Sequence, residues 1–262
     1  MKNEILSFLP PDFPWGESLY VYDCIDSTNT LAKELAKAGA PAGTAVIAAA
    51  QSGGRGRMGR SFSSPPGGLY LTVILRPACP AEMLLHLTCC AGVAAAEAIK
   101  TTAGVTPQLK WINDLILNGR KVGGILTELG LNSRGDAEFA LIGIGINCAQ
   151  NIPPELGEIA TSLEAETGKP LSPAVLAAAL LQRLYDIDRR LLTDRAALMD
   201  TYRSLCLTRN RDILVLRGEQ CLPAHAIDVT NEGALLVAYP DGHEEALQSG
   251  EVSIRGLLGY SS

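Results

Sequence analysis

The segment from Leu109 to Cys148 reads LKWINDLILNGRKVGGILTELGLNSRGDAEFALIGIGINC. Its short apolar runs are rich in β-branched residues and therefore predict three strands. The predicted strands are Leu109–Ile116, Val122–Leu129 and Glu138–Cys148. Asn118-Gly119 separates the first two and Asn132–Asp136 separates the last two, and both sequences favour hairpin turns. The segment thus predicts the core of a β-sheet.

Further elements are predicted on both sides of this sheet core. Two more strands are expected at Thr44–Ala50 and Leu69–Leu75, and helices at Asn29–Ala38, Ala81–Thr102, Pro173–Leu192 and Asp194–Leu205. Ser27 or Thr28 should cap the first helix and Gly39 should end it. One face of that helix should hold Leu31, Leu35 and Ala38.

The pattern changes beyond Arg209, where short strands alternate with turn sequences. The turns are expected at Gly218, Asn231–Gly233 and Asp241-Gly242, a spacing typical of a small β-barrel. We place a domain boundary near Thr208, which divides the chain into residues 1–208 and 209–262.

The composition is that of a folded globular chain with a local cationic region. The 262 residues are 47% hydrophobic and 19% charged, and their formal net charge is −6, which argues against general binding of nucleic acid. No Asp or Glu occurs from Leu35 to Ala81, although Lys37, Arg55, Arg57, Arg60 and Arg76 lie there. We therefore expect an anion site in this stretch.

The cysteines and the apolar segments bear on the location of the protein. The chain has seven cysteines and no CxxC pair, which favours a reduced, cytoplasmic protein. We expect no membrane span, because no 18 apolar residues run together. His86, Cys89 and Cys90 have helical spacing, but two cysteines and one histidine are a weak basis for a metal site.

The loop Gly54–Arg60 reads GRGRMGR and combines flexible backbone with guanidinium groups, which suits it to hold phosphate or carboxylate. It matches the dinucleotide fingerprint and, except for Arg60 in place of lysine, the P-loop. Both motifs need a helix directly afterwards, and Ser61–Gly68 reads SFSSPPGG, so we reject both. A mobile loop without a partner, or a weak contact to RNA, is the remaining alternative for the loop alone.

Two strand motifs complete the candidate site. In Gly143–Asn147 (GIGIN) the glycines share one bare face with Asn147, which would let a flat ligand approach the backbone, whereas the isoleucines face a core. Tight strand packing is the alternative. Lys110–Asp114 (KWIND) and Lys121–Leu126 (KVGGIL) place two lysines and an aspartate on neighbouring strands, although Lys121 alone would also suit a solvated position.

Five motifs occur together in the order and approximate spacing of the biotin protein ligase family. They are Ser27-Thr28-Asn29, Gln51 with Gly54–Arg60, Lys110–Asp114, Lys121–Leu126 and Gly143–Asn147. The chain therefore resembles that family from Asp23 to Asn147, and more weakly at Gly250–Arg255. The resemblance implies an α/β (α+β) catalytic domain with a mixed sheet, akin to class II aminoacyl-tRNA synthetases, followed by an SH3-like barrel.

The resemblance also implies an activity with ATP and biotin as substrates and Mg²⁺ as the metal. Biotin would be activated to biotinyl-5′-AMP and transferred to a lysine of a biotin carboxyl carrier protein, such as the acetyl-CoA carboxylase subunit. A homodimer is compatible with it. Lipoate or octanoate ligases share the fold, but GRGRMGR and KWIND argue against them. A non-catalytic biotin sensor is the alternative from another class.

The roles implied by the resemblance fall on three sets of residues. The biotin contacts would be Ser27, Thr28, Asn29, Gln51, Gly54, Arg55, Arg57, Lys121, Gly143 and Gly145. The contacts with ATP and the adenylate would be Arg57, Arg60, Phe62, Lys110, Asn113, Lys121 and Asn147. The catalytic residues would be Arg57, Lys121 and Asp114, and Asp114 would either hold the metal or orient the acceptor amine.

Three features depart from the pattern of many family members. Ile112 replaces a proline, and since isoleucine suits extended backbone we expect little change there. Phe62 replaces a tryptophan, so stacking on adenine should be weaker or differently arranged. Only 26 residues precede Ser27, fewer than the roughly 55 that an independent domain needs, so we expect no DNA-binding domain.

Overall fold

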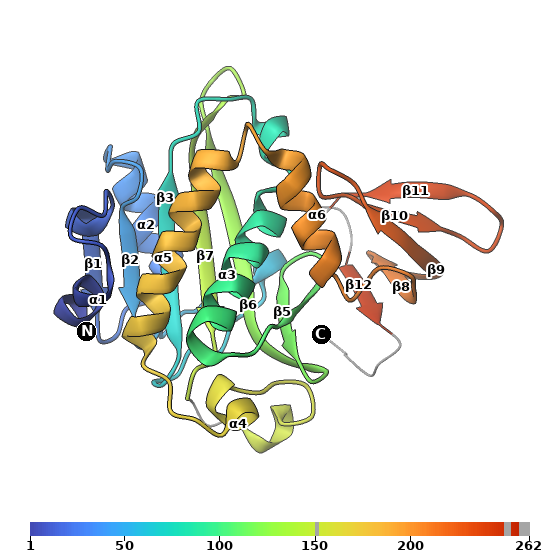
Figure 1. The fold of residues 1–262 in the computed structure, drawn as a ribbon. Helices are drawn as coiled ribbons and strands as arrows, with labels where there is room; N and C mark the ends of the chain where they lie inside the picture. Colours follow the sequence, from blue (N-terminus) through green and yellow to red (C-terminus); the bar gives the residue numbers. More distant parts are fainter. Residues whose placement is uncertain (150–151, 249–252, 257–262) are drawn as a thin grey trace.

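A seven-stranded mixed sheet forms the centre of the larger part of the molecule (Figure 1). The computed structural model describes residues 1–149, 152–248 and 253–256. The strand order is β1-β2-β3-β7-β6-β5-β4. β1 and β2 are parallel and all other neighbours are antiparallel. The strands are β1 Leu19–Tyr22, β2 Ala45–Ala48, β3 Leu69–Leu75, β4 Gln108–Lys110, β5 Asp114–Leu117, β6 Arg120–Leu131 and β7 Ala137–Ile146.

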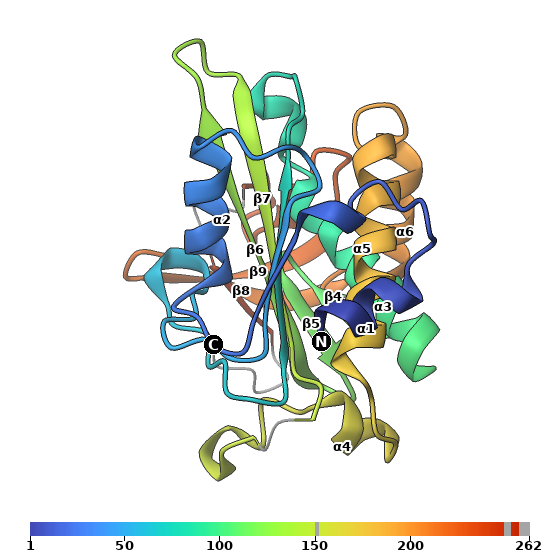
Figure 2. The ribbon, with the colours of Figure 1, turned by 90° about the vertical axis from the view of Figure 1, so that its left-hand side faces the viewer.

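Helices cover both faces of this sheet. Figure 2 shows α2 on one face, and α3, α5 and α6 on the other. The helices are α1 Lys2–Phe8, α2 Thr28–Lys37, α3 Leu87–Ala103, α4 Leu163–Thr167, α5 Pro173–Arg190 and α6 Arg195–Leu205. Four of them match the predicted positions; α1, α4 and the edge strand β1 were not predicted. Ala32 and Ala36 of α2 are buried, and Leu31 and Leu35 pack against the same cluster, whereas Ala38 follows the helix and is exposed.

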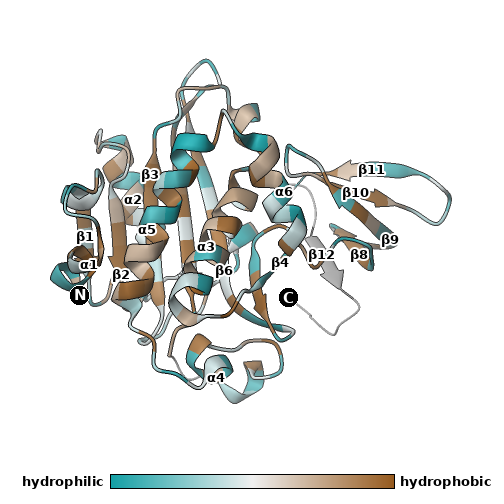
Figure 3. Cartoon of the chain, viewed as in Figure 1, coloured by the Kyte–Doolittle hydropathy of each residue, from teal (hydrophilic) through white to brown (hydrophobic). Residues whose placement is uncertain are grey.

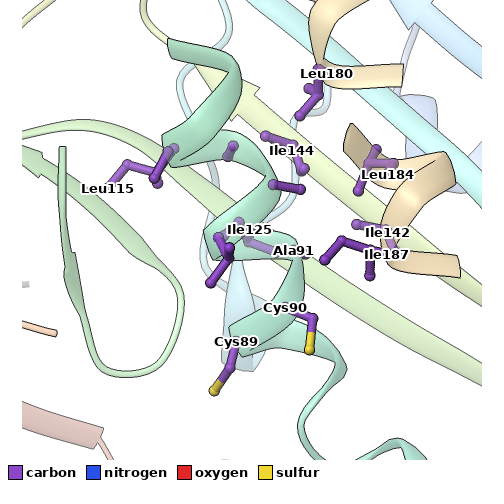
Figure 4. Close-up of a cluster of buried hydrophobic side chains, with 14 of the residues drawn as sticks. Cys89, Cys90, Ala91, Leu115, Ile125, Ile142, Ile144, Leu180, Leu184 and Ile187 are labelled. Carbon is purple, nitrogen blue, oxygen red and sulfur yellow. The ribbon is translucent and has the colours of Figure 1, made fainter. Parts of the chain in front are cut away.

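The main core lies between the sheet and the pair α3 and α5. Ile142 and Ile144 of β7 gather there with Leu180 and Leu184 of α5 (Figure 4). Burying one such side chain stabilises a fold by about 1.5–3 kcal/mol. Figure 3 shows the same division by hydropathy, with apolar strands β2 and β3 and polar turns on the outer side of α5. The prediction that the isoleucines of β7 face a core is confirmed, and Gly143 faces the opposite side.

The apolar region Ala81–Ala103 serves as a core element. It is long and apolar enough to cross a membrane, but 72% of that window is buried inside the fold. The sequence predicted one helix here, whereas the structure has a 3-10 turn at Ala81–Leu84 followed by α3. Gly104 ends α3 in the left-handed conformation, with φ of 73°.

The predicted strand Leu109–Ile116 is in fact two strands. β4 and β5 pair with each other, with Lys110 opposite Asp114, and residues 111–113 form the turn between them. Because Ile112 lies in this turn, the expectation of extended backbone there was wrong. The peptide bond between Trp111 and Ile112 is cis. The backbone N–H of Trp111 donates to Thr208 Oγ1 at 2.9 Å and its indole Nε1 donates to Gly233 O at 2.9 Å. These tertiary contacts outweigh the local preference for a strand.

The C-terminal part, predicted as a small β-barrel of short strands, is a five-stranded antiparallel sheet. Its order is β11-β10-β9-β8-β12, with β8 Arg211–Arg217, β9 Gln220–Val229, β10 Leu235–Ala238, β11 Glu244–Leu247 and β12 Ser253–Gly256. Gly218, Gly233 and Gly242 have positive φ of 59°, 84° and 86° in the predicted turns. Of the motif Gly250–Arg255, the first three residues lie outside the described residues.

Candidate active site

A cavity of about 300 Å³ lies where the first turn of α2, the strands β6 and β7 and the loop Gly54–Phe62 meet. We call this loop the arginine loop. The structure brings most of the sequence-predicted site residues together around the cavity. They are Ser27, Thr28, Asn29, Gln51, Arg55, Arg57, Arg60, Phe62, Lys110, Asn113, Asp114, Lys121, Gly143 and Gly145.

The first turn of α2 provides a set of buried hydroxyl and amide groups. Ser27 caps the helix, and its Oγ accepts a hydrogen bond from Thr30 N at 3.4 Å. Thr28 donates from its backbone N–H and its hydroxyl to Gln51 Oε1, at 2.8 and 3.1 Å. Gln51 Nε2 in turn donates to Ser64 Oγ at 2.9 Å. These bonds orient the polar groups at this end of the cavity.

The side chain of Asn29 is held at both ends of its amide. Its Oδ1 accepts from the Thr72 hydroxyl at 2.7 Å, and its Nδ2 donates to Glu128 Oε2 at 3.0 Å. A Cβ atom on Gly143 would lie 2.0 Å from Asn29 Oδ1. The glycine is therefore needed so that the amide can lie against β7.

The arginine loop is a closed turn with hydrogen bonds across its base. Phe62 N donates to Gly54 O at 2.9 Å, and Gly56 N donates to Arg60 O at 2.7 Å. Residues 57–59 form a 3-10 turn at the tip. The described residues 60–68 contain no helix, which confirms the rejection of the P-loop and the dinucleotide motif.

The cavity carries an excess of positive charge. Within the described residues it is lined by one carboxylate, Asp114, and by five cationic side chains: Arg55, Arg57, Arg60, Lys110 and Lys121. Lys121 Nζ lies 2.6 Å from Asp114 Oδ1, so Lys121 is paired inside the cavity. Such a charge balance attracts an anionic ligand.

Arg57 lies deeper in this cationic group than its sequence neighbours in the loop. Its guanidinium donates to Asn113 Oδ1 at 3.1 Å. Burial lowers the pKa of Arg57; the charge of Asp114 acts against this effect, and that of Arg60 adds to it. Arg57 stays protonated at neutral pH and would gain from the arrival of a negative charge.

Phe62 forms an apolar wall over β6 and β7. A Cβ atom on Gly145 would lie 2.6 Å from the Phe62 ring, and one on Gly124 would lie 3.3 Å from it. The ring meets Tyr70 edge to face at 6.4 Å between centroids, and Lys121 Nζ lies 5.9 Å from the Phe62 centroid. The bare faces of Gly143 and Gly145 are thus filled by Asn29 and Phe62, and not left fully open to a ligand.

Two of the predicted residues do not line the cavity. Gly54 lies at the base of the arginine loop, where a Cβ would come within 2.3 Å of Phe62 O, and so it serves the shape of the loop. Asn147 is buried, and its Nδ2 donates to Thr161 O at 2.9 Å. It supports the segment that follows β7 instead of reaching the cavity.

Several lining residues were not among the predicted contacts. Tyr70 lies within the apolar strand β3, and its sequence context did not indicate a role in the site. Trp111 was quoted within KWIND without a role. Ile159 lies in a region with little signature and reaches the cavity because Lys121 N donates to Ile159 O at 2.8 Å and Thr161 N donates to Lys121 O at 2.9 Å.

Comparisons with known proteins identify the family of the chain. The model of the biotin/lipoate A/B protein ligase family matches residues 21–147. The chain is 36% identical over 235 residues to the bifunctional ligase/repressor BirA of Bacillus spizizenii, covering 87% of this chain and 71% of that protein. It is 30% identical over 236 residues to the biotin–[acetyl-CoA-carboxylase] ligase of Mycobacterium tuberculosis, covering 86% and 85%.

A solved structure extends the likeness over nearly the whole fold. The biotin protein ligase of Aquifex aeolicus in complex with biotin and ATP superimposes with a TM-score of 0.78 at 29% identity, covering 92% of this chain and 99% of that one. The mixed sheet, the cationic cavity and these matches lead to one conclusion: the chain belongs to the biotin protein ligase family.

Proposed function

We propose that the cavity under the arginine loop joins biotin to ATP and then presents the activated biotin to a lysine of an acceptor protein. The chain is a biotin–[acetyl-CoA-carboxylase] ligase that acts through biotinyl-5′-AMP. One observation supports this location above all: the same cavity is lined by hydroxyl and amide groups, from the first turn of α2 and Gln51, and by five cationic side chains. Biotin has a polar ureido group at one end and a carboxylate at the other, so the two sets match its two ends.

We place the ureido group of biotin among Ser27, Thr28, Asn29 and Gln51. Thr28 and Gln51 are bonded to each other, and Ser27 and Asn29 are held by bonds to other residues, so the four side chains are already oriented, which lowers the entropy lost on binding. The carboxylate of biotin would then extend past Phe62 toward Arg57 and Lys121. This placement assigns the contacts that the family resemblance implies to residues that lie around one cavity in the structure.

In the first step, an oxygen of the biotin carboxylate attacks the α-phosphorus of ATP. A bond forms between that oxygen and phosphorus, the bond to the β-phosphate oxygen breaks, and pyrophosphate leaves with the electron pair. Negative charge is crowded during this displacement, and Arg57 and Lys121 would stabilise it. Lys121 would exchange its contact with Asp114, at 2.6 Å, for the phosphate.

In the second step, the neutral amine of the acceptor lysine attacks the carbonyl carbon of biotinyl-AMP. The new amide bond forms as the bond to the phosphate oxygen breaks, AMP leaves and the nitrogen gives up a proton. By binding the AMP phosphate, Arg57 would both retain the intermediate and stabilise the leaving group. We propose that the acceptor is the biotin carboxyl carrier domain of acetyl-CoA carboxylase.

The residues present fit Mg²⁺ bound together with a nucleotide. Asp114 is the one carboxylate among the described residues that line the cavity, and Mg²⁺ often binds one or two carboxylates plus substrate phosphates. Asp114 would therefore hold the metal, which would neutralise phosphate charge when bound. We also propose a reducing compartment, the cytoplasm, because all seven cysteines lie in the described residues and each is free.

The test is acceptor labelling with ATP and either biotin or lipoate, with pyrophosphate release measured in parallel. Biotin should be attached to the acceptor lysine, and pyrophosphate should be released only when biotin is present. Attachment of lipoate alone would overturn the proposal in favour of a lipoate ligase. Tight biotin binding without pyrophosphate release would identify a sensor instead.

A further inference from the structure

Glu128 connects two parts of the site that lie far apart in the sequence. It lies on β6, and its side chain is 17% exposed. Oε2 accepts from Asn29 Nδ2 at 3.0 Å and lies 3.4 Å from the guanidinium of Arg55. Oε1 lies 3.3 Å from Lys33 Nζ. One carboxylate therefore holds the first turn of α2 and the base of the arginine loop.

Glu128 itself does not line the cavity, although Asn29 and Arg55 do. We propose that Glu128 is a positioning residue for biotin, which acts by fixing the amide of Asn29 and by anchoring Arg55. The inference rests on the proposed placement of biotin in this cavity. No part of it requires Glu128 to touch a substrate.

The first effect of Glu128 is on the orientation of the Asn29 amide. An ionised carboxylate only accepts hydrogen bonds, so it must face the NH₂ group and not the oxygen of the amide. Oδ1 of Asn29 is thereby directed to the hydroxyl of Thr72, which donates to it at 2.7 Å. Without Glu128, Nδ2 would keep only the long 3.4 Å contact to Leu126 O, and the amide could rotate.

The second effect of Glu128 is to give Arg55 and Arg57 different roles in the arginine loop. Arg55 is paired with Glu128 at the base of the loop, whereas Arg57 donates to Asn113 on the other side of the cavity. Held in this way, the loop presents Arg57 to the ligand in one position. Because Arg55 is neutralised by Glu128, it competes less with Arg57 for the ligand anion.

The charge state of Glu128 suits this role. Burial alone would raise its pKa, but the hydrogen bond from Asn29 and the charges of Arg55 and Lys33 outweigh burial, so the pKa lies below its ordinary value. Glu128 is therefore ionised throughout the neutral pH range and keeps its acceptor character.

Calorimetric titration of biotin into Glu128→Met tests the inference. Methionine has a similar length and lacks the carboxylate, so both Asn29 and Arg55 lose their partner. We expect the Kd for biotin to rise about 10- to 100-fold, the range for the loss of hydrogen bonds to a charged group. The KM for ATP at saturating biotin should change less than about threefold, because Arg57 and Lys121 keep their own contacts.

Two further variants separate positioning from general stability. Lys33 is the third partner of Glu128 and does not line the cavity. Lys33→Met should therefore leave the Kd for biotin unchanged. Glu128→Gln keeps an acceptor for Asn29 but loses the charge that faces Arg55, so the Kd should rise about fivefold. This conservative variant also keeps the inference testable if Glu128→Met does not fold.

The outcomes distinguish this inference from the proposed function. If the unaltered protein does not bind biotin, the proposed function fails and the variants are not the cause. If it binds biotin and both Glu128 variants bind it equally well, the inference is wrong. Equal losses of affinity for biotin and for ATP, with a matching fall in melting temperature, would also overturn it, since they indicate a structural role.

Discussion

Replacing Gly143 by alanine should disturb the site through one side chain. The added Cβ would lie 2.0 Å from Oδ1, 2.9 Å from Cγ and 3.1 Å from Nδ2 of Asn29. Asn29 is 5% exposed, and its amide is bonded to Thr72 and to Glu128. It can move away from the methyl group only by giving up these bonds.

The hydrogen bonds that Asn29 would give up determine how much stability Gly143→Ala should lose. The neutral bond to Thr72 contributes about 0.5–1.5 kcal/mol and the bond to the charged Glu128 about 1.5–3 kcal/mol, so the variant should lose about 2–4.5 kcal/mol of stability. The melting temperature should fall by roughly 5–15 °C. Displacement of Asn29 should also raise the Kd for biotin about fivefold or more, through one lost hydrogen bond.

Thermal unfolding without ligand and calorimetry with biotin measure the two effects. Gly92→Ala is a control, because its Cβ would meet Leu109 at 3.4 Å and Ile125 at 3.5 Å, both ordinary contacts, and Gly92 does not itself line the cavity. The control should bind biotin as the unaltered protein does. A Gly143→Ala variant whose melting temperature and Kd both match those of the unaltered protein would refute the reasoning.

Three further predictions concern the loop, the thiols and the contact between the two sheets. Arg57→Gly should release the reactive adenylate, since a charge-assisted bond to phosphate contributes about 1.5–3 kcal/mol, and mass spectrometry should find biotin on bystander lysines; retention as long as in the unaltered protein would contradict this role. Iodoacetamide should modify the native protein at the exposed Cys24 and Cys221 and leave the five buried thiols unreacted, as peptide mapping would show. Trp111→Phe should lower the free energy of unfolding by about 1 kcal/mol in urea denaturation, because the 2.9 Å bond to Gly233 O is lost; an unchanged value would mean that this bond contributes little.

The parts of the fold that the sequence predicted well have strong local patterns. β3 matches its predicted range, Leu69–Leu75, because this short, mostly apolar run is rich in β-branched and aromatic residues, which favour a buried strand. The turns at Gly218 and Gly242 were found because positive φ favours glycine. In these places the local sequence and the tertiary structure require the same conformation.

Prediction failed where a contact distant in sequence decides the conformation. The segment from Lys110 to Asp114 has the composition of a strand, yet it turns back on itself because Trp111 is bonded to Thr208 and Gly233 in the C-terminal part. The bonds span 97 and 122 residues of sequence, so no local window contains them. The approach of Ile159 to Lys121 has the same origin.

The sequence predicted the residues that line the cavity more completely than the residues that orient them. Charged and glycine-rich motifs indicated most of the residues that line the cavity, because those residue types are costly or unusual elsewhere. Residues that orient them have no such signature: Glu128 lies near the end of a predicted strand and looks like an ordinary solvated carboxylate. Only the structure shows that Asn29 and Arg55 share it.

The arrangement of charges explains how one cavity can both bind the nucleotide and retain the adenylate that forms from it. Before ligands arrive, the repulsion among its cations is reduced because Arg55 is paired with Glu128 and Lys121 with Asp114. These pairs have different tasks in the proposed reaction. Glu128 does not line the cavity, so its pair can persist and keep the loop in place, whereas the pair inside the cavity must open for phosphate. A site in which both pairs had to open would bind the nucleotide at the expense of the loop that retains the adenylate. The persistent pair of Arg55 and Glu128 thus keeps in place the loop that retains the intermediate. The exchangeable pair of Lys121 and Asp114 frees Lys121 for the phosphate while the intermediate forms.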